Sequence, residues 1–272
     1  MSDFAANLGI SYEIGAARGD YSILGAMDVN REEFFAAFGQ TINDLIIKHR
    51  EDLERRRKEN PRMAAMRNFI HPSSASAPKT RWADGTPEYS LHIYGLHRLF
   101  PQARFIHLFR DVQAVVRSMV NFHRVTGIHL VANEEEAYRY WLRTVTACLK
   151  AERAFGPTVV YRVRYSDMVT NAESTMRSLL SFLGEPYAPN CLDPLAHRIN
   201  SSEVPDDFKS GDRAADPAVI RTAMRLCAEV EQTPQPIEAS PAAADELEAA
   251  FRERFESMAP PWLSLAKAAA DN

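Results

Sequence analysis

The chain has 272 residues, of which 46% are hydrophobic, so it can bury one large core and is not intrinsically disordered. Its formal net charge of −4 argues against a general nucleic-acid binder, which needs a basic surface. Its three cysteines show neither metal-ligand nor disulfide spacing, and no apolar run is long enough to span a bilayer. With no secretory signal at the start of the sequence, these features predict a cytoplasmic protein without metal, nucleic acid or membrane span, folded as a single domain over residues 1–272.

The N-terminal part of the chain is predicted to hold one long helix. Residues 1–30 give a poorly defined pattern, with a short strand at Ser11–Ile14 and glycines that break the following stretch into loop. Asn30 then provides an N-cap for a helix whose first turn is acidic. The apolar positions of this helix recur at helical spacing and predict a buried face: Phe34, Phe35, Phe38, Ile42, Leu45, Ile46 and Leu53.

A strand followed by a helix forms the clearest pattern, in the middle of the chain. Upstream of it, Trp82–Tyr89 leads into a helix that runs to Phe100. Phe105–Phe109 is a short apolar run after a turn, which predicts a buried strand in which His107 is packed. Asp111 lies at the N-cap position of the next helix. The apolar face of that helix is predicted to consist of Val112, Val115, Val116, Met119 and Val120.

The remaining sequence continues the alternation of helices and strands. The predicted elements are a helix at Glu134–Phe155, a strand at Thr158–Val163, a helix capped by Asn171, and helices at Pro217–Val230 and Ala242–Met258. The core face of Glu134–Phe155 is assigned to Ala137, Trp141, Val145, Cys148 and Leu149. A proline-rich link, residues 233–241, joins the last two helices. This alternation predicts an α/β fold with three layers, α/β/α, around a parallel sheet.

The turn after Phe105–Phe109 is also the predicted ligand site. In open α/β sheets, ligands bind outside the carboxyl ends of the strands, where helix N-termini favour anions. Arg110 offers a fork-shaped cation at this place, and Ser118 offers a hydroxyl two turns into the helix. The pattern favours a bound phosphate, and a salt bridge from Arg110 to a neighbouring carboxylate is the alternative.

This strand-to-helix pattern resembles the 3′-phosphate-binding element of sulfotransferases that use PAPS, 3′-phosphoadenosine 5′-phosphosulfate. Two more segments resemble the bacterial and Golgi-type branch in the same order: Trp82–Tyr89 before the strand, and Val159–Met168 with a helix that ends at Gly184. The resemblance covers residues 79–211 and implies a sulfotransferase-like fold of the P-loop nucleotide-binding type. It implies transfer of a sulfuryl group from PAPS to a hydroxyl or amine of a small-molecule, lipid or carbohydrate acceptor. The second product is adenosine 3′,5′-bisphosphate (PAP).

The resemblance also implies roles for individual residues. Arg110 and Ser118 are expected to bind the 3′-phosphate. Tyr165 is expected to help enclose the adenine, with a plain core aromatic as its alternative role. Lys209 opens Lys209–Gly211, which is similar to a shortened form of the family's late phosphate-binding loop.

Two parts of the family's pattern are not found in the sequence. The nearest counterpart of the Gly-rich loop that grips the 5′-phosphosulfate is Gly15–Ser22, which carries Asp20 and follows a poor strand, so we expect a fold that is incomplete at its N-terminal side. Gly85 stands where relatives often carry a lysine near the scissile bond, and Lys79 is a candidate substitute. The catalytic base is unassigned, and His71 is the histidine to test.

Two functions therefore stay open: a sulfotransferase, and a truncated or non-catalytic sulfotransferase-like module that binds nucleotide. A P-loop kinase is a third, but the sequence has no Walker lysine motif. In the family, the strand that carries the Gly-rich loop lies beside the equivalent of Phe105–Phe109. The lack of a convincing strand of this kind before Asn30 predicts an unpaired sheet edge. Tyr12–Ala16 fills it imperfectly, or a second copy covers it in a homo-oligomer, or the chain is only marginally stable; we favour the last two together.

Overall fold

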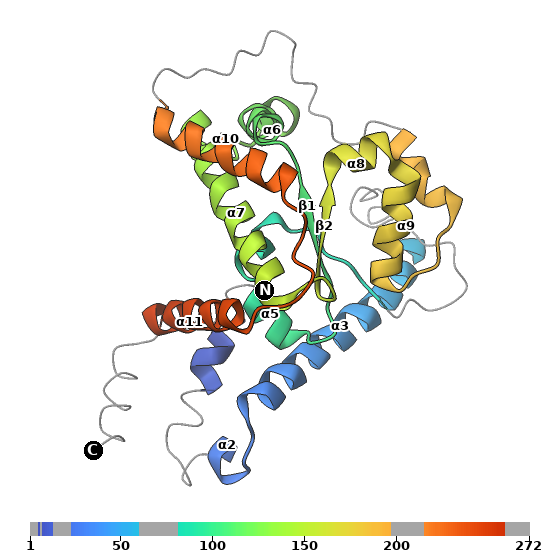
Figure 1. The fold of residues 1–272 in the computed structure, drawn as a ribbon. Coiled ribbons are helices and arrows are strands. Elements are labelled where there is room, and N and C mark those ends of the chain that lie inside the picture. Colours follow the sequence, from blue (N-terminus) through green and yellow to red (C-terminus); the bar gives the residue numbers. More distant parts are fainter. Residues whose placement is uncertain (1–4, 6, 13–22, 60–80, 197–214, 259–272) are drawn as a thin grey trace. The chain divides into compact units, whose positions relative to one another are not determined.

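The computed structural model describes residues 5, 7–12, 23–59, 81–196 and 215–258 (Figure 1). The chain divides into two compact units. Unit 1 consists of Met1–Pro87, Gly95–Gln102 and Glu253–Asn272, and unit 2 consists of Glu88–Tyr94 and Ala103–Arg252. The single domain expected over residues 1–272 stays a prediction.

Unit 1 contains the long helix α3, Arg31–Glu59. Asn30 and Glu33 form a reciprocal capping box at its start. The Glu33 amide donates to the Asn30 side-chain oxygen at 2.9 Å, and the Asn30 amide donates to the Glu33 carboxylate at 3.2 Å. The predicted N-cap is confirmed, and it satisfies two backbone donors that a helix start leaves without intrahelical partners.

The apolar face predicted for α3 is buried only in part. Phe35 is 1% exposed, whereas Phe38 and Leu45 are 40% and 60% exposed, so a continuous buried face is wrong. Burial is deepest where a glycine allows close approach. A Cβ placed on Gly39 would lie 1.6 Å from the carbonyl oxygen of Leu99, so only glycine fits against that backbone.

The segment before α3 also differs from its prediction. Ser11 and Tyr12 are helical rather than extended, and the Ser11 hydroxyl donates to the Asn7 carbonyl one turn earlier at 2.9 Å. The Tyr12 ring lies 5.4 Å from the ring of Phe34, a tertiary contact that the local pattern does not encode. The remainder of the predicted strand lies outside the described residues. The short helix α2, Ile23–Ala26, follows.

Unit 2 holds a small parallel sheet. Strand β1 is Phe105–Phe109 and strand β2 is Val160–Arg164. They pair in parallel, with Phe105 opposite Val160 and Phe109 opposite Arg164. The first predicted strand and the parallel sheet are confirmed, and the second strand begins two residues later than predicted. Among the described residues the sheet has these two strands alone, so the unit is mostly helical.

The two faces of β1 are buried very differently. His107 and Phe109 are 6% and 1% exposed, and they face helix α7, Glu134–Phe155, whose bounds match the prediction. Ile106 and Leu108 on the other face are 45% and 57% exposed. The strand is therefore buried on one face rather than on both.

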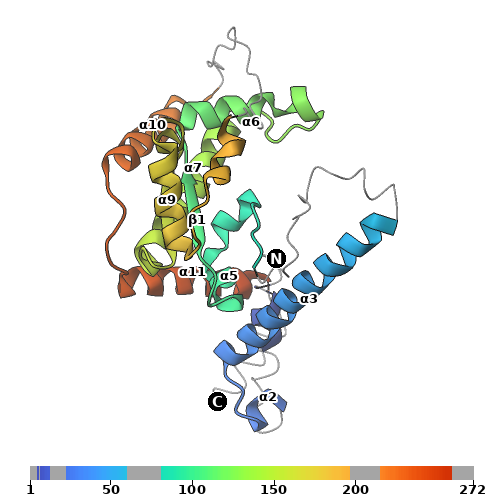
Figure 2. The same ribbon diagram turned by 90° about the vertical axis from the view of Figure 1, so that its right-hand side faces the viewer.

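Helices cover the sheet from two sides (Figures 1 and 2). Helices α6, Val112–Thr126, and α10, Pro217–Gln232, lie with α7 on one side. Helices α8, Tyr165–Thr170, and α9, Ala172–Leu183, lie toward the other side, where the Phe182 ring stacks on Tyr161 of β2 at 5.1 Å. The main core includes Phe109, Val112, Val116, Ala137, Trp141, Val145, Ala223 and Cys227. Unit 2 is thus mostly helical with a small parallel sheet, and the full three-layer α/β/α fold stays a prediction.

Shorter elements complete the described chain. They are η2 at Pro87–Leu91, α5 at Ile93–Leu99, η3 at Pro189–Ala196 and α11 at Pro241–Met258. Neither η3 nor α8 is predicted from the sequence. Across the described ranges, no helix is both long and apolar enough to cross a membrane.

A side chain rather than a strand pairs with the outer edge of β2. The Gln235 side-chain oxygen accepts from the Arg162 amide at 2.8 Å, and the Gln235 side-chain nitrogen donates to the Val160 carbonyl. Gln235 lies in the link between α10 and α11, so this link closes the edge. On the far edge of β1, no described residue forms a second pairing with the strand. The sheet is therefore closed on one edge only within the described chain.

A buried ionic cluster ties α7 to both strands. Glu152 of α7 is 0% exposed; its carboxylate lies 2.6 Å from His107 Nδ1, and it accepts from Arg162 Nε at 3.0 Å and from Arg162 Nη2. Burial opposes ionisation of Glu152, but the bonds from His107 and Arg162 outweigh it and hold the pKa of the carboxyl below its ordinary value. The predicted packing of His107 is confirmed.

Candidate functional site

The site begins at the junction of β1 and α6. Asp111 caps the helix, since its side chain accepts from the Ala114 amide at 2.9 Å. This cap fixes where the strand ends and the helix begins, as predicted. Arg110, immediately before the cap, is exposed at the carboxyl end of β1. A flexible guanidinium is therefore held next to the positive end of a helix dipole.

Tyr165 joins Arg110 at this edge of the sheet. It is the first residue of α8, directly after β2, and is 40% exposed. The Arg110 guanidinium lies 4.4 Å from the centre of the Tyr165 ring, a cation–π contact. The structure thus brings together two residues that the sequence assigned separately to the same ligand. Among the described residues, no carboxylate forms a salt bridge with Arg110.

Ser118 lies on α6 and is half-buried. It stands one turn beyond Ala114, on the helix face that carries the Asp111 cap, because residues four apart share a face. One turn rises about 5.4 Å, so the hydroxyl lies along the helix from the junction rather than at it. A ligand shared between Ser118 and Arg110 stays a prediction.

Trp141 is part of this site and was assigned only to the core. Its indole N–H donates to the Arg110 carbonyl at 3.3 Å, and its ring lies 6.1 Å from the ring of Phe109. Trp141 is 3% exposed. The signal available in the sequence was the indole N–H itself, because a buried tryptophan on an apolar face needs an acceptor.

Helix α10 contacts the same junction through Cys227. The thiol lies 3.8 Å from the second carboxylate oxygen of Asp111, within the range for a weak S–H donor. Burial, together with the nearby Asp111 and Glu231 carboxylates, raises the pKa of Cys227. The thiol therefore keeps its proton and acts as a donor to Asp111.

Comparison with known proteins assigns the chain to a family. Residues 27–189, more than half of the chain, match the profile described as "Sulfotransferase family". The chain belongs to the sulfotransferase family. The matched range contains Arg110, Ser118 and Tyr165, whereas Gly15–Ser22 and Lys209 lie outside it.

Individual relatives match shorter stretches of the chain. It is 28% identical over 133 residues to the omega-hydroxy-beta-dihydromenaquinone-9 sulfotransferase Stf3 of Mycobacterium tuberculosis, covering 43% of the chain and 34% of that relative. It is 31% identical over 96 residues to protein-tyrosine sulfotransferase 1 of Danio rerio, covering 34% of the chain and 26% of that relative. The match thus spans about a third or less of each curated relative.

Two solved structures also match. The sulfotransferase domain from the Synechococcus PCC 7002 olefin synthase gives a TM-score of 0.35 at 20% identity, covering 62% of this chain and 57% of that one. The sulfotransferase domain from the curacin biosynthetic pathway gives a TM-score of 0.35 at 23% identity, covering 61% of each chain.

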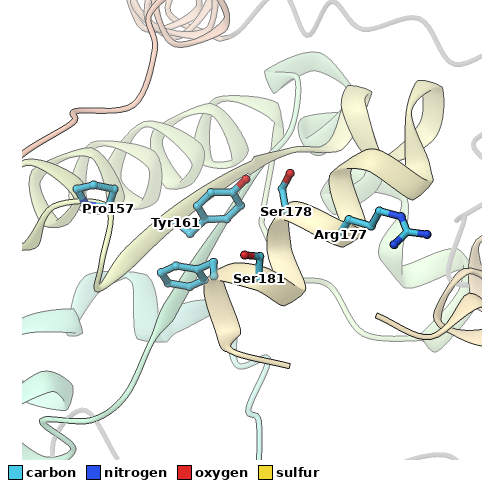
Figure 3. A pocket seen from close by; sticks show the side chains of 6 residues that line it. Pro157, Tyr161, Arg177, Ser178 and Ser181 are labelled. Atoms are coloured by element: carbon cyan, nitrogen blue, oxygen red, sulfur yellow. The ribbon is translucent and has the colours of Figure 1, made fainter. Parts of the chain in front are cut away.

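An open hollow lies at the end of the sheet opposite to the Arg110–Tyr165 site. It has a volume of about 550 Å³ and is lined by Pro157, Tyr161, Arg177, Ser178, Ser181 and Phe182 (Figure 3). Pro157 and Tyr161 mark the amino end of β2, whereas Arg110 lies beyond the carboxyl end of β1. The hollow is therefore separate from the Arg110–Tyr165 site, and no predicted site residue lines it.

Several predicted residues lie outside the described chain. They are the loop candidate Gly15–Ser22, His71, Lys79 and Lys209. Gly85 is described and exposed, and a Cβ built on it meets nothing within 4 Å. Position 85, where the resemblance implies a lysine, is therefore sterically open to a side chain.

Proposed function

We propose that this sulfotransferase binds PAPS and PAP through the 3′-phosphate at the β1–α6 junction and transfers the sulfuryl group to a hydroxyl acceptor. The observation that carries the proposal is the position of Arg110, which stands at a strand's carboxyl end and a helix N-terminus with its guanidinium on Tyr165. Membership of the sulfotransferase family supports the reaction class.

The residues of the junction fit a doubly charged phosphate. A hydrogen bond from a guanidinium to a charged group contributes about 1.5–3 kcal/mol, more than the roughly 0.5–1 kcal/mol of an exposed cation–π contact. A phosphate can therefore draw the Arg110 guanidinium from the Tyr165 ring, which leaves the ring face for adenine. Ser118 adds a hydroxyl donor further along α6.

The bound co-substrate supplies the activated sulfuryl group, and the protein must hold the 5′ end of the nucleotide for transfer. Gly15–Ser22 resembles the family's 5′ loop poorly, and Gly85 lacks the side chain of the usual lysine. We therefore propose slow turnover. The second candidate function is a nucleotide-binding module without catalysis, which the open glycine at position 85 favours.

The names of two relatives suggest the class of acceptor. One names a hydroxylated menaquinone and the other names protein tyrosine, and both carry hydroxyl groups. A hydroxyl rather than an amine acceptor is therefore the first class to assay, from lipids and phenols to carbohydrates.

Calorimetry with PAP and with adenosine 5′-monophosphate, which lacks the 3′-phosphate, tests the nucleotide site. Arg110→Ala is expected to weaken PAP about tenfold to a hundredfold and the monophosphate less than about twofold. Arg177→Ala is the matched control, since Arg177 also stacks on a tyrosine, Tyr187, at 3.7 Å but lies on α9. Equal losses for both ligands in Arg110→Ala would remove the assignment.

A further inference from the structure

The junction that carries Arg110 is held from behind by one side chain of α7. Trp141 contacts two consecutive residues of it: its ring packs edge-on against Phe109, and its indole N–H donates to the carbonyl of Arg110. This carbonyl lies one residue past the end of β1, so it is beyond the ladder with β2. The indole of Trp141 thus holds the peptide group that follows the Arg110 Cα.

Helix α7 is well suited to hold a fixed position. Three turns beyond Trp141, the buried Glu152 binds His107 of β1 and Arg162 of β2. Between these points, Val145 and Cys148 pack into the cores on the same side of the sheet. The helix is therefore anchored to the strands at their middle and at their carboxyl end.

We infer that Trp141 is a positioning residue for 3′-phosphate recognition, acting through the Arg110 backbone. The direction in which the Arg110 side chain leaves the chain depends on the backbone dihedrals at that residue. The hydrogen bond from the Trp141 indole to the Arg110 carbonyl fixes the plane of the peptide that follows Arg110. The Asp111 side chain fixes the start of α6 immediately after that peptide. Loss of the indole bond lets this peptide rotate, so that the guanidinium samples positions away from the phosphate. This inference rests on the proposed binding of the 3′-phosphate at Arg110.

The quantity to measure is the ratio of the affinity for PAP to the affinity for adenosine 5′-monophosphate. The two ligands differ by the 3′-phosphate, so the ratio reports how much that phosphate contributes to binding. Trp141→Phe keeps most of the ring packing and removes the N–H. Site-specific replacement of Trp141 by 3-benzothienylalanine keeps both rings and removes only the N–H, so it serves if the phenylalanine variant is poorly folded. Val145→Ala, one turn along the same buried face, is the structural control: it removes core packing from α7 and leaves the bond from Trp141 to the Arg110 carbonyl in place.

The expected result is a ratio lowered about fivefold in both Trp141 variants and unchanged in Val145→Ala, with affinity for the monophosphate retained throughout. An unchanged ratio in the Trp141 variants, while Arg110→Ala still lowers it, would overturn the positioning role and leave the proposed function standing. An unchanged ratio in Arg110→Ala would overturn both.

Discussion

The buried Glu152 provides the sharpest test of what holds unit 2 together. Glu152→Gln removes the charge but keeps the shape of the side chain. It leaves the guanidinium of Arg162, whose side chain is 5% exposed, without its counter-charge. Two unit charges about 4 Å apart interact by about 4 kcal/mol at an effective dielectric constant of about 20. Arg162 keeps its bond to the Thr233 carbonyl at 2.9 Å, which offsets part of the loss.

We therefore expect Glu152→Gln to lower the free energy of unfolding by about 3 kcal/mol at pH 7. Urea titration followed by far-ultraviolet circular dichroism measures this difference by linear extrapolation. The control is Glu173→Gln, because Glu173 forms an ion pair with Arg177 whose side chains are 58% and 56% exposed. Exposed pairs of this kind contribute little, so the control is expected to change stability by less than about 0.5 kcal/mol.

The pH dependence gives a second criterion. The pKa of Glu152 is held below its ordinary value of 4.5 in the folded chain, so its contribution is fully present above pH 4.5 and is lost as pH falls through the folded pKa. The difference in free energy of unfolding between wild type and Glu152→Gln should thus stay constant from neutral pH down to about pH 4.5, and should shrink as pH falls further. A difference in free energy of unfolding below about 1 kcal/mol at pH 7 would refute the assigned ionic role of Glu152, and so would a difference that does not change at acid pH.

Two further predictions concern catalysis and the sheet edge. With PAPS and a panel of hydroxyl acceptors, a radiolabelled-sulfate assay should show wild-type turnover below about 1 s⁻¹. Gly85→Lys should raise it at least about tenfold without lowering the melting temperature, whereas Gly85→Ala should not; equal rates would contradict a role for this position. In hydrogen exchange, the amides of Ile106 and Leu108 should gain protection with protein concentration, because a second copy can pair with β1. Protection of both amides that is independent of concentration, in a monomer, would show instead that the chain itself covers this edge.

The sequence predicts well those elements whose limits are set by neighbouring residues. Glu134–Phe155 is bounded by an asparagine cap and a glycine, and Phe105–Phe109 is bounded by a turn and an aspartate cap. Helix α8 was missed because it has only six residues, none of them buried, and follows a strand directly. The stripe of α3 was overestimated because periodicity shows which residues share a face, not whether another element covers that face.

The candidate site was predictable as a set of residues but not as a set of contacts. Chain order places Arg110 and Tyr165 at the ends of parallel strands, but their cation–π contact is seen only in the structure. The bond from Trp141 to the Arg110 carbonyl joins residues 31 positions apart, and nothing local specifies it. The same holds for the hollow near Tyr161, whose lining comes from β2, α9 and the turn before β2.

During synthesis, the edge of β2 can be closed only after Gln235 has been added to the chain. The Gln235 side chain bonds the Val160 carbonyl from 75 residues further along the chain. At about 5–20 residues per second, the ribosome needs roughly 4–15 s after adding Val160 to reach that glutamine. During this interval the outer edge of β2 lacks the amide that later occupies it, although both strands have been made. The nascent chain therefore passes through a stage at which strand-to-strand association between neighbouring ribosomes is possible, and arrival of the 233–241 link ends that stage.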